Sequence, residues 1–454
     1  MRKILLLLAL LAAGCGGTPP PAVPHEEEPP RPAQVNAGES WKITTRGAGR
    51  EIEGYADRVS VLPGERFALH VSTTAPRFSA SAFRMGAHPS KVWESAQVQG
   101  VRQAPARTVD GMVTAAHWKP SLTVDTTGWP EGAYLIRLDA STGAQRHVPV
   151  TVRSASARGR VVMVNAVTTW QAYNLWGGRS LYQGPGGYDG RSREVTFDRP
   201  YDGGGARLFL DFEQEALAVA ERSGVPLAYL TDLDLAPGAL DGARAVVSLG
   251  HDEYWSPSMR AAVTRARDSG TNLAFLGANA VYWRIAVEGR KIACDKESRC
   301  PLWRDSRPES SLVGQMYDCF PAQGVYTVRR PRHWIFAGTE GRRFPGMVGP
   351  ESDKVSRGSP DGVEVLADSP FSCGGRATTS HSTYYVAPSG AGVFASGTMR
   401  WVCAMRGKRC GHGVPRAAAA FTRRATTNLL TRFAAGPAGR TTTSARAGSP
   451  PAAS

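Results

Sequence analysis

Several common signals of function are missing from this 454-residue sequence. It contains no Gly-x-Ser-x-Gly elbow, no His-Glu-x-x-His zinc motif and no P-loop, which argues against the enzyme classes built on these motifs. Runs of basic residues with interleaved aromatic residues are also absent, although the formal net charge is +15. Because the arginines are spread along the whole chain, this charge does not indicate nucleic-acid binding. It fits a solvated arginine-rich surface, or attraction to anionic components of a cell envelope.

The apolar segment near the start of the chain is too short to span a bilayer. Residues 4–13 are apolar and follow Arg2 and Lys3, which predicts an export signal and not a membrane helix. The sequence of residues 11–15 resembles a bacterial lipoprotein signal, so we expect a signal peptide at residues 1–14 and lipidation of Cys15. The protein would then be anchored by lipid to the bacterial cell envelope, facing the periplasm or the exterior. A soluble secreted protein, cut near the same place, is the alternative.

Proline-rich and cysteine-containing segments agree with an exported protein. Residues 15–40 are rich in proline and cannot bury a core, which predicts an extended tether. The six cysteines after Cys15 are an even number, which favours disulfides. Six cysteines allow 15 connectivities, and we expect the local pairs Cys294 with Cys300 and Cys403 with Cys410. A zinc site using Cys403, Cys410 and His412 lacks the close Cys-x-x-Cys spacing typical of such sites.

Residues 41–153 have the pattern of an all-β domain. Short segments with alternating apolar residues are separated by turns such as those at residues 63–64 and 130–132. This pattern predicts a β-sandwich that is immunoglobulin-like. No group of acids and bases is visible in it, so we interpret it as a positioning or binding module. Its histidines, at positions 70, 88, 117 and 147, are interpreted as ordinary surface or pairing residues.

The periodicity changes at residues 154–159, and residues 159–435 have the pattern of a second domain. Continuous apolar strands alternate with helical segments, which predicts a doubly wound, mostly parallel α/β domain of the flavodoxin or glutamine-amidotransferase type. After Gly436 the composition predicts a disordered tail over residues 436–454. The expected strands are residues 161–164, 227–230, 245–249, 272–276, 363–366, 382–386 and 392–397, and the expected helices are residues 208–222, a segment from Pro257 onward and 417–433.

Three stretches with polar and aromatic side chains follow directly after expected strands. They are residues 168–174, which continue to Tyr182, residues 250–256 and residues 276–284. In a doubly wound sheet the carboxyl ends of the strands lie at one edge, so we expect these stretches to meet there. From residues 250–256 alone, a turn whose Trp and Tyr cap the core is an equally good interpretation.

These stretches, together with residues 197–201 and 232–235, resemble the C-terminal domain of the N,N-dimethylformamidase large (beta) subunit-like family. The resemblance covers about residues 160–435. It implies one ferric ion per chain, held by two tyrosines and one glutamate, which correspond to Tyr173, Tyr182 and Glu253. It also implies that His251 and Asn279 lie beside the metal, and that a further acid is used late in the domain. The apolar segment around residues 385–386 offers no such acid.

The implied ligand set is chemically coherent. Phenolates and a carboxylate are hard anionic ligands that favour a trivalent cation over zinc. The resemblance therefore implies a metal-dependent amidase that hydrolyses an amide C–N bond, with His251 moving protons and Asn279 stabilising an oxyanion. The expected partners are a small amide substrate, a membrane through the lipid anchor, and a small partner subunit or further copies of the chain. The alternative is a non-catalytic lipoprotein that binds a ligand or a surface.

Overall fold

The computed structural model describes residues 40–47 and 49–439. Within them the chain is a mixed α/β protein with many strands in several sheets and few helices. The predicted signal peptide, Cys15, nearly all of the predicted tether and residues 440–454 of the predicted tail lie outside the described residues. No helix of the described part combines the length and the apolar character needed to cross a bilayer.

The first part of the described chain forms two sheets around one apolar cluster. Along β3 the side chains of Phe67, Leu69 and Val71 are buried at every second position, as expected for a strand with one face on a core. They share this cluster with Ile136 and Leu138 of the second sheet. One sheet has the order β1 (Ile52–Ala56), β3 (Arg66–Thr73), β9 (Leu122–Asp125), and the other has the order β2 (Ser60–Val61), β11 (Gln145–Val152), β10 (Gly132–Ala140), β4 (Arg77–Arg84), β5 (Ser90–Glu94), with β6 (Val98–Gln99) beside β4. A separate hairpin joins β7 (Arg107–Val109) and β8 (Met112–Thr114).

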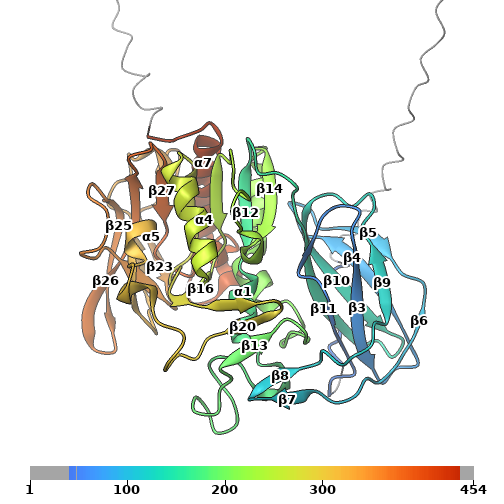
Figure 1. Cartoon of the computed structure of the whole chain (residues 1–454). Helices are drawn as coiled ribbons and strands as arrows, with labels where there is room; N and C mark the ends of the chain where they lie inside the picture. The colour runs from blue at the N-terminus through green and yellow to red at the C-terminus, as the bar shows by residue number, and fades with distance from the viewer. Residues whose placement is uncertain (1–39, 48, 440–454) are drawn as a thin grey trace, which may run out of the picture. The chain divides into compact units, whose positions relative to one another are not determined.

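A seven-stranded sheet organises the second part (Figure 1). Its first five strands are parallel, and the last two are antiparallel to their neighbours. The predicted, mostly parallel sheet is therefore present with an antiparallel edge. The order across the sheet is β14 (Leu227–Thr231), β12 (Val161–Asn165), β15 (Ala245–Ser248), β17 (Asn272–Phe275), β27 (Gly392–Ala395), β26 (Arg376–Val386), β25 (Glu364–Cys373).

Both faces of this sheet are buried. In β12 the side chains of Val161 and Met163 belong to one apolar cluster, while Val162 and Val164 belong to another. A strand buried on both faces needs an unbroken apolar sequence, which explains why this segment has no polar alternation. The chain leaves β12 for β14 on one side and later returns to β15 on the other side. The crevice at such a change of direction is where ligands bind in open α/β sheets.

Helices cover the two faces. Helix α4 (Pro257–Asp268) begins with Ser256, whose Oγ accepts a hydrogen bond from Met259 N at 3.3 Å, and it packs on one cluster. Helices α3 (Gln214–Arg222) and α7 (Arg416–Ala434) pack on the other cluster. The single helix predicted over residues 208–222 is wrong: the chain breaks at Glu213 into α2 (Arg207–Phe212) and α3. The cause is the Glu213 carboxylate, which turns inward to accept hydrogen bonds from Asn165 and Trp170.

The six cysteines that follow Cys15 all form disulfides. The predicted pairs Cys294–Cys300 and Cys403–Cys410 are confirmed, and Cys319 pairs with Cys373. Because Cys403 and Cys410 are bonded to each other, their thiols are not available to a zinc site with His412.

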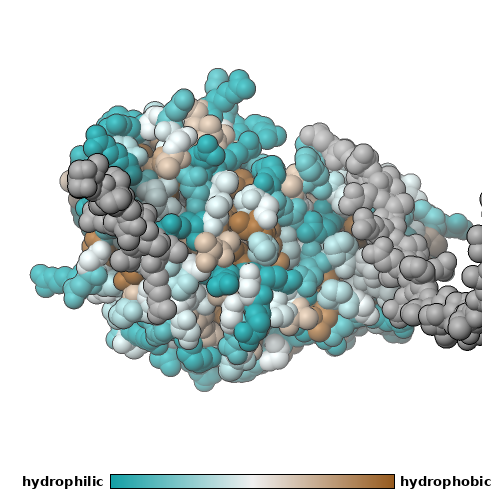
Figure 2. All heavy atoms as spheres, turned by 90° about the horizontal axis from the view of Figure 1, so that it is seen from above, coloured by the Kyte–Doolittle hydropathy of each residue, from teal (hydrophilic) through white to brown (hydrophobic). Residues whose placement is uncertain are grey.

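The first part of the described chain contacts the second part directly, since Arg84 of β4 and Glu221 of α3 form an ion pair at 2.7 Å. The face shown in Figure 2 is mostly hydrophilic, with apolar residues in small separate areas. The remaining elements are α1 (Val167–Tyr173), η1 (Trp176–Gly178), β13 (Glu194–Thr196), η2 (Asp232–Asp234), β16 (Tyr254–Trp255), β18 (Trp283–Arg284), β19 (Ala286–Glu288), β20 (Lys291–Ala293), η3 (Trp303–Asp305), α5 (Ser310–Val313), β21 (Met316–Cys319), β22 (Gly324–Thr327), η4 (Trp334–Phe336), β23 (Arg343–Val348), β24 (Ser352–Lys354), α6 (Trp401–Ala404) and η5 (Gly407–Cys410).

Candidate active site

The turns that follow β15 and β17 lie against each other at the carboxyl edge of the sheet. A Cβ on Gly277 would lie 1.8 Å from the carbonyl oxygen of Gly250, so only glycine permits this approach. Gly250 itself has a φ of +56°, and a Cβ there would lie 2.4 Å from the carbonyl oxygen of Phe212. The two glycines therefore bring His251 and Glu253, which follow β15, close to Asn279, which follows β17.

Helix α1 places Tyr173 at the same edge. The fully buried Arg199 donates hydrogen bonds to the carbonyl oxygens of Gln171 at 3.2 Å and Asn174 at 3.0 Å, where the helix ends. Burial lowers the pKa of Arg199 to about 10, which leaves it charged at neutral pH. The backbone N–H of Glu253 donates to Thr169 Oγ1 at 3.0 Å. This hydrogen bond joins α1 directly to the turn at residues 250–256, which we call the central turn.

Tyr182 reaches the site from a loop that is fixed to α1. The backbone N–H of Leu181 donates to the carbonyl oxygen of Ala172 at 3.0 Å, and Leu181 is fully buried. Ser180 Oγ accepts a hydrogen bond from the backbone N–H of Tyr182 at 3.1 Å, which shapes the turn. The ring of Tyr182 stacks on the ring of Tyr173 with centroids 4.5 Å apart.

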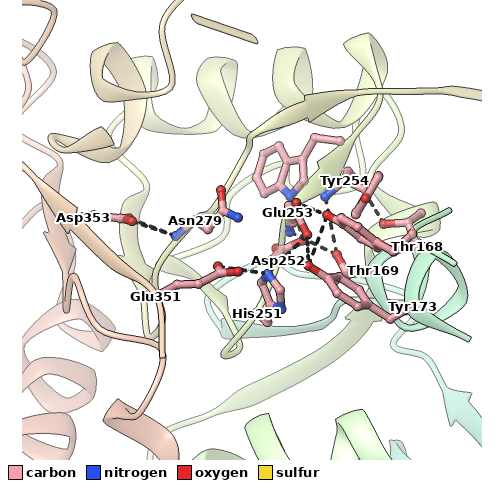
Figure 3. A network of polar contacts seen from close by, with 12 residues as sticks. Thr168, Thr169, Tyr173, His251, Asp252, Glu253, Tyr254, Asn279, Glu351 and Asp353 are labelled. Carbon is pink, nitrogen blue, oxygen red and sulfur yellow. Dashed lines mark hydrogen bonds and ion pairs between the residues drawn. The ribbon is translucent and has the colours of Figure 1, made fainter. Parts of the chain in front are cut away.

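The structure brings the three sequence-predicted ligands together. The Tyr173 hydroxyl donates to Glu253 Oε2 at 2.7 Å, and the Tyr182 hydroxyl donates to Glu253 Oε1 at 2.5 Å. The two hydroxyl oxygens are 3.1 Å apart. Figure 3 shows Tyr173 and Glu253 pointing toward each other from α1 and the central turn. Their role as metal ligands stays a prediction.

Burial and charge determine the protonation of this group. Burial raises the pKa of both Tyr173 and Tyr182 well above the usual value, and the negative charge of Glu253 raises it further. Burial also acts to raise the pKa of Glu253, but the hydrogen bond and charge of His251, together with the charge of Lys296, outweigh burial and lower it. With protein groups alone, the site holds one carboxylate and two neutral phenols. A cation would be needed to hold the phenols as phenolates.

His251 lies between two carboxylates. Its Nε2 atom is 3.3 Å from Glu253 Oε2 and 3.5 Å from Glu351 Oε2 (Figure 3). Burial alone would lower the pKa of His251, but the negative charges of Glu351 and Glu253 outweigh burial and raise it. Burial also raises the pKa of Glu351 to about 7, against the effect of the His251 charge.

Glu351, which lies beside His251, is an acidic residue that sequence analysis did not single out. It lies in the segment between β23 and β24, in the irregular region where no strand pattern could be assigned. Tyr385 is instead a core residue, whose hydroxyl donates to the carbonyl oxygen of Leu312 at 2.6 Å. The one available signal was Gly349-Pro350-Glu351-Ser352-Asp353, an acid pair in a turn.

Asn279 is fixed through its backbone. Its N–H donates to both carboxylate oxygens of Asp353, at 2.9 and 3.1 Å. Its φ of +57° is a left-handed conformation that asparagine tolerates better than most residues. Burial raises the pKa of Asp353 to about 8. The hydrogen bond from the Asn279 backbone to Asp353 is drawn in Figure 3, and the Asn279 side chain forms a hydrogen bond with the Glu351 carboxyl.

Lys296 is a second residue that sequence analysis missed. Its Nζ atom lies over the face of the Tyr182 ring, 3.1 Å from the centroid, and 4.7 Å from the centroid of Trp283. Burial lowers the pKa of Lys296 to about 7. The residue belongs to the short loop closed by the Cys294–Cys300 disulfide, and this closed loop is the only sequence feature that pointed to it.

The residues present fit a single hard cation. The two phenol oxygens and the two carboxylate oxygens of Glu253 are joined by distances of 2.5–3.1 Å, which is the spacing of neighbouring ligands on one small ion. Beside them the buried His251 Nε2 atom lies between the carboxylates of Glu253 and Glu351, and the buried Asn279 Oδ1 atom has no hydrogen-bond partner, which is unusual for a buried polar atom. In the described ranges, this site included, no group of three or more His, Cys, Asp or Glu residues is placed to hold a metal ion. A cation here would therefore depend on the tyrosine oxygens.

One cavity borders a residue of the site. It holds about 20 Å³ and is lined by Tyr173, Trp170, Tyr201 and Phe209, but not by Tyr182, His251, Glu253 or Asn279. This volume accommodates about one water molecule. Two larger cavities, of about 330 and 550 Å³, lie elsewhere and contain none of the predicted site residues.

Comparison with solved structures gives only distant likenesses. A cytoplasmic protein from Salmonella typhimurium matches with 10% identity and a TM-score of 0.26, over 48% of this chain and 85% of that one. A ThuA-like protein from Bacteroides uniformis matches with 11% identity and a TM-score of 0.30, over 62% of this chain and 93% of that one. A cycloisomaltooligosaccharide glucanotransferase from Paenibacillus matches with 14% identity and a TM-score of 0.15, over 27% of this chain and 17% of that one. At these scores the likenesses carry no argument about function.

Comparison with protein families is more informative. No curated protein matches the chain. A family model described as N,N-dimethylformamidase beta subunit-like, C-terminal, matches residues 79–413. The match begins in β4 and ends shortly before α7, so it contains every candidate site residue as well as part of the first two sheets. It covers well over half of the sequence, and on this ground the chain belongs to the N,N-dimethylformamidase beta subunit-like family.

Proposed function

We propose that this protein hydrolyses the C–N bond of a small amide, using one ferric ion held by Tyr173, Tyr182 and Glu253. The observation that carries the proposal is the meeting of two phenol oxygens and one carboxylate at 2.5–3.1 Å. The three residues come from separate segments and meet at the edge of the sheet where ligands bind in this type of fold. Membership of the N,N-dimethylformamidase beta subunit-like family is consistent with a hydrolase.

The donor set favours iron in its ferric state. Phenolate and carboxylate oxygens are hard and negatively charged, and they match a small trivalent cation better than zinc. When bound, the ion supplies Lewis acidity toward an amide carbonyl and acidifies a water molecule. The stacking of Tyr173 on Tyr182 and the cation of Lys296 over the Tyr182 ring hold the two phenol rings in position.

His251 and Glu351 are the proton carriers in this proposal. The His251 imidazole is buried, and its Nε2 atom lies 3.3 Å from Glu253 and 3.5 Å from Glu351. Because the charges of these carboxylates raise its pKa, the imidazole holds a proton more readily and can deliver it to the leaving amine. The Glu351 carboxyl, with a pKa of about 7, can share that proton.

Asn279 orients the substrate. Its backbone is held by Asp353, so its side-chain position does not depend on a substrate. An amide N–H₂ group fixed in this way can donate a hydrogen bond to the oxygen on which negative charge develops during attack on a carbonyl. Such fixed donors act in the transition state without reorganisation.

The family and the chain's predicted context shape the rest of the proposal. Because the chain belongs to the N,N-dimethylformamidase beta subunit-like family, we propose a substrate with small substituents on the amide. We further propose that residues 41–153 form an immunoglobulin-like sandwich, that residues 159–435 form a flavodoxin-like domain, and that the protein is a lipoprotein of the cell envelope. A small partner subunit or a second copy of the chain would be compatible with this site.

The test combines metal analysis with an assay. We expect the purified protein to contain close to one iron per chain and to show a visible tyrosinate-to-iron charge-transfer band. It should release amine from at least one member of a panel of short N-alkyl formamides and acetamides. A protein that takes up no iron and releases no amine would contradict the proposal and favour a non-catalytic ligand-binding protein.

A further inference from the structure

A second concave surface lies outside the candidate active site. It has a volume of about 550 Å³, within the range of small-molecule sites. Trp41 and Pro89 lie on one side, and residues of α2, α3, η5 and α7 lie on the other. We call it the arginine groove, because Arg222, Arg406, Arg409 and Arg423 all line it.

The arginine groove holds more positive than negative charge. Its wall contains one carboxylate, that of Glu215, which lies 3.6 Å from Arg423. Arg406 lies 3.8 Å from Asp211. In the described part of the chain, Arg222 and Arg409 form no ion pair. Burial and the nearby charge of Arg423 lower the pKa of Arg222, which shows that the guanidinium groups repel one another.

Two of these guanidinium groups are already held in place. Arg406 donates a hydrogen bond to the carbonyl oxygen of Leu210, and Arg423 is held by Glu215. Arg406 and Arg409 lie in the segment closed by the Cys403–Cys410 disulfide, which restricts its movement. Groups fixed in advance lose less conformational entropy when a ligand binds. Uncompensated, partly fixed guanidinium groups are typical of phosphate sites, where two parallel N–H groups contact two oxygens.

Part of the lining of the groove is apolar. Trp41, Ala87 and Pro89 contribute to it, together with Leu210 of α2 and Ala218 of α3. An indole ring offers a flat surface on which the C–H face of a sugar ring can stack. The groove therefore combines a phosphate-binding side with a side suited to a ring, and its volume exceeds what an inorganic anion needs.

We propose that the arginine groove binds a phosphorylated sugar, either free or at the end of a glycan chain. The phosphate contacts the four arginines, and the sugar ring packs on Trp41. The proposal does not depend on the amidase function, because the groove shares no lining residue with the candidate active site.

Calorimetric titration of the full-length protein tests the proposal. The probes are glucose 6-phosphate, glucose and inorganic phosphate. We expect glucose 6-phosphate to bind at least ten times more tightly than either of the others, and its affinity to fall at least tenfold in Arg222→Gln/Arg409→Gln. The matched control Arg332→Gln/Arg357→Gln removes two charges from exposed residues outside the groove, and it should bind like the unmodified protein. Thermal unfolding confirms that both variants are folded.

Three results would overturn the proposal. The first is no measurable binding of glucose 6-phosphate. The second is equal binding of inorganic phosphate or glucose, which would remove the need for a joined phosphate and sugar. The third is an equal loss of affinity in the control variant, which would assign binding to overall charge. An oligosaccharide with one terminal 6-phosphate distinguishes the source: tighter binding than glucose 6-phosphate indicates a glycan end, and equal binding indicates a free sugar phosphate.

Discussion

Two buried clusters in this protein each contain a tyrosine and a glutamate, but the contacts of the glutamate differ. In the first part of the chain, Tyr55 donates to the carbonyl oxygen of Ala115 at 3.0 Å, and Glu53 accepts from Trp176 Nε1 at 2.7 Å. At the carboxyl edge of the large sheet, Glu253 accepts hydrogen bonds from two phenols. There the Nε2 atom of His251 also lies 3.3 Å from Glu253 and 3.5 Å from a second carboxylate, that of Glu351.

The comparison shows which feature separates a structural cluster from a candidate site. Burial raises the pKa of Tyr55 and of Tyr173 alike, so a perturbed pKa does not distinguish them. The partners of the glutamate do. Glu53 accepts a hydrogen bond from one indole, whereas Glu253 is contacted by two phenols and an imidazole, and such a convergence of ionisable side chains at one edge of a sheet marks a candidate site. Variants of matched residues in the two clusters can break or sharpen this distinction.

The largest effect is expected for Glu253→Gln. The substitution keeps the shape of the side chain but removes the charge that a cation shared with Tyr173 and Tyr182 requires. We expect iron content to fall below about one tenth and amide turnover to fall roughly 1000-fold. The matched control is Glu53→Gln in the structural cluster, which should keep iron and turnover. Unchanged iron in Glu253→Gln, measured by mass spectrometry of the metal, would contradict the assignment.

A smaller effect is expected for His251→Asn. If His251 moves protons and does not bind the metal, turnover should fall about 100-fold or more while iron content stays the same. The measurement is amine release together with metal analysis of the same sample. Loss of iron in this variant would make His251 a ligand, and turnover within about twofold of normal would remove it from the mechanism.

The third effect concerns stability and pH. The pKa of Asp353 is raised from 3.8 to about 8 in the folded protein, because burial disfavours its charge. Between these values the folded state binds more protons than the unfolded state, so stability falls as pH rises, by up to about 1.4 kcal/mol per pH unit. Asn at position 353 cannot titrate, so in Asp353→Asn the free energy of unfolding should depend less steeply on pH. Urea unfolding at about pH 5, 6 and 7 measures this dependence. The same slope as in the unmodified protein would contradict the burial argument, and the exposed control Asp241→Asn should keep that slope.

The smallest effect is expected for Tyr55→Phe. The change removes one of the two hydrogen bonds to the carbonyl oxygen of Ala115, which keeps the N–H of Trp118 as a donor, and it should lower the free energy of unfolding by about 1 kcal/mol. Iron content and turnover should not change, whereas Tyr173→Phe should lose iron. Chemical unfolding and metal analysis of the two variants give the comparison. Similar behaviour of both would mean that the clusters do not differ in kind.

The main architecture of the second part could be predicted because it depends on local patterns. The apolar runs of β12, β15 and β17 and the Ser256-Pro257 start of α4 are visible in the sequence, and all of them are present. The break between α2 and α3 could not be predicted. It depends on the buried contacts of Glu213 with Asn165 and Trp170, which come together only in the folded chain.

The candidate site was predictable where its residues follow strands and not where they come from irregular segments. Tyr173, Glu253 and Asn279 each lie shortly after a parallel strand, and the topology of the sheet gathers them. Glu351 and Lys296 lie in segments without periodicity, and the turn and the cysteine-closed loop that contain them do not indicate where the chain places them. Their positions are set by long-range contacts, such as the Cys294–Cys300 disulfide for Lys296.

The central claim is that the oxygens of Tyr173, Tyr182 and Glu253 share one iron ion. The most direct test is a crystal structure of protein grown with ferric iron, with X-ray data collected on both sides of the iron absorption edge. We expect one anomalous peak per chain, within bonding distance of all three side chains. No peak at this position, or a peak held by other residues, would contradict the account.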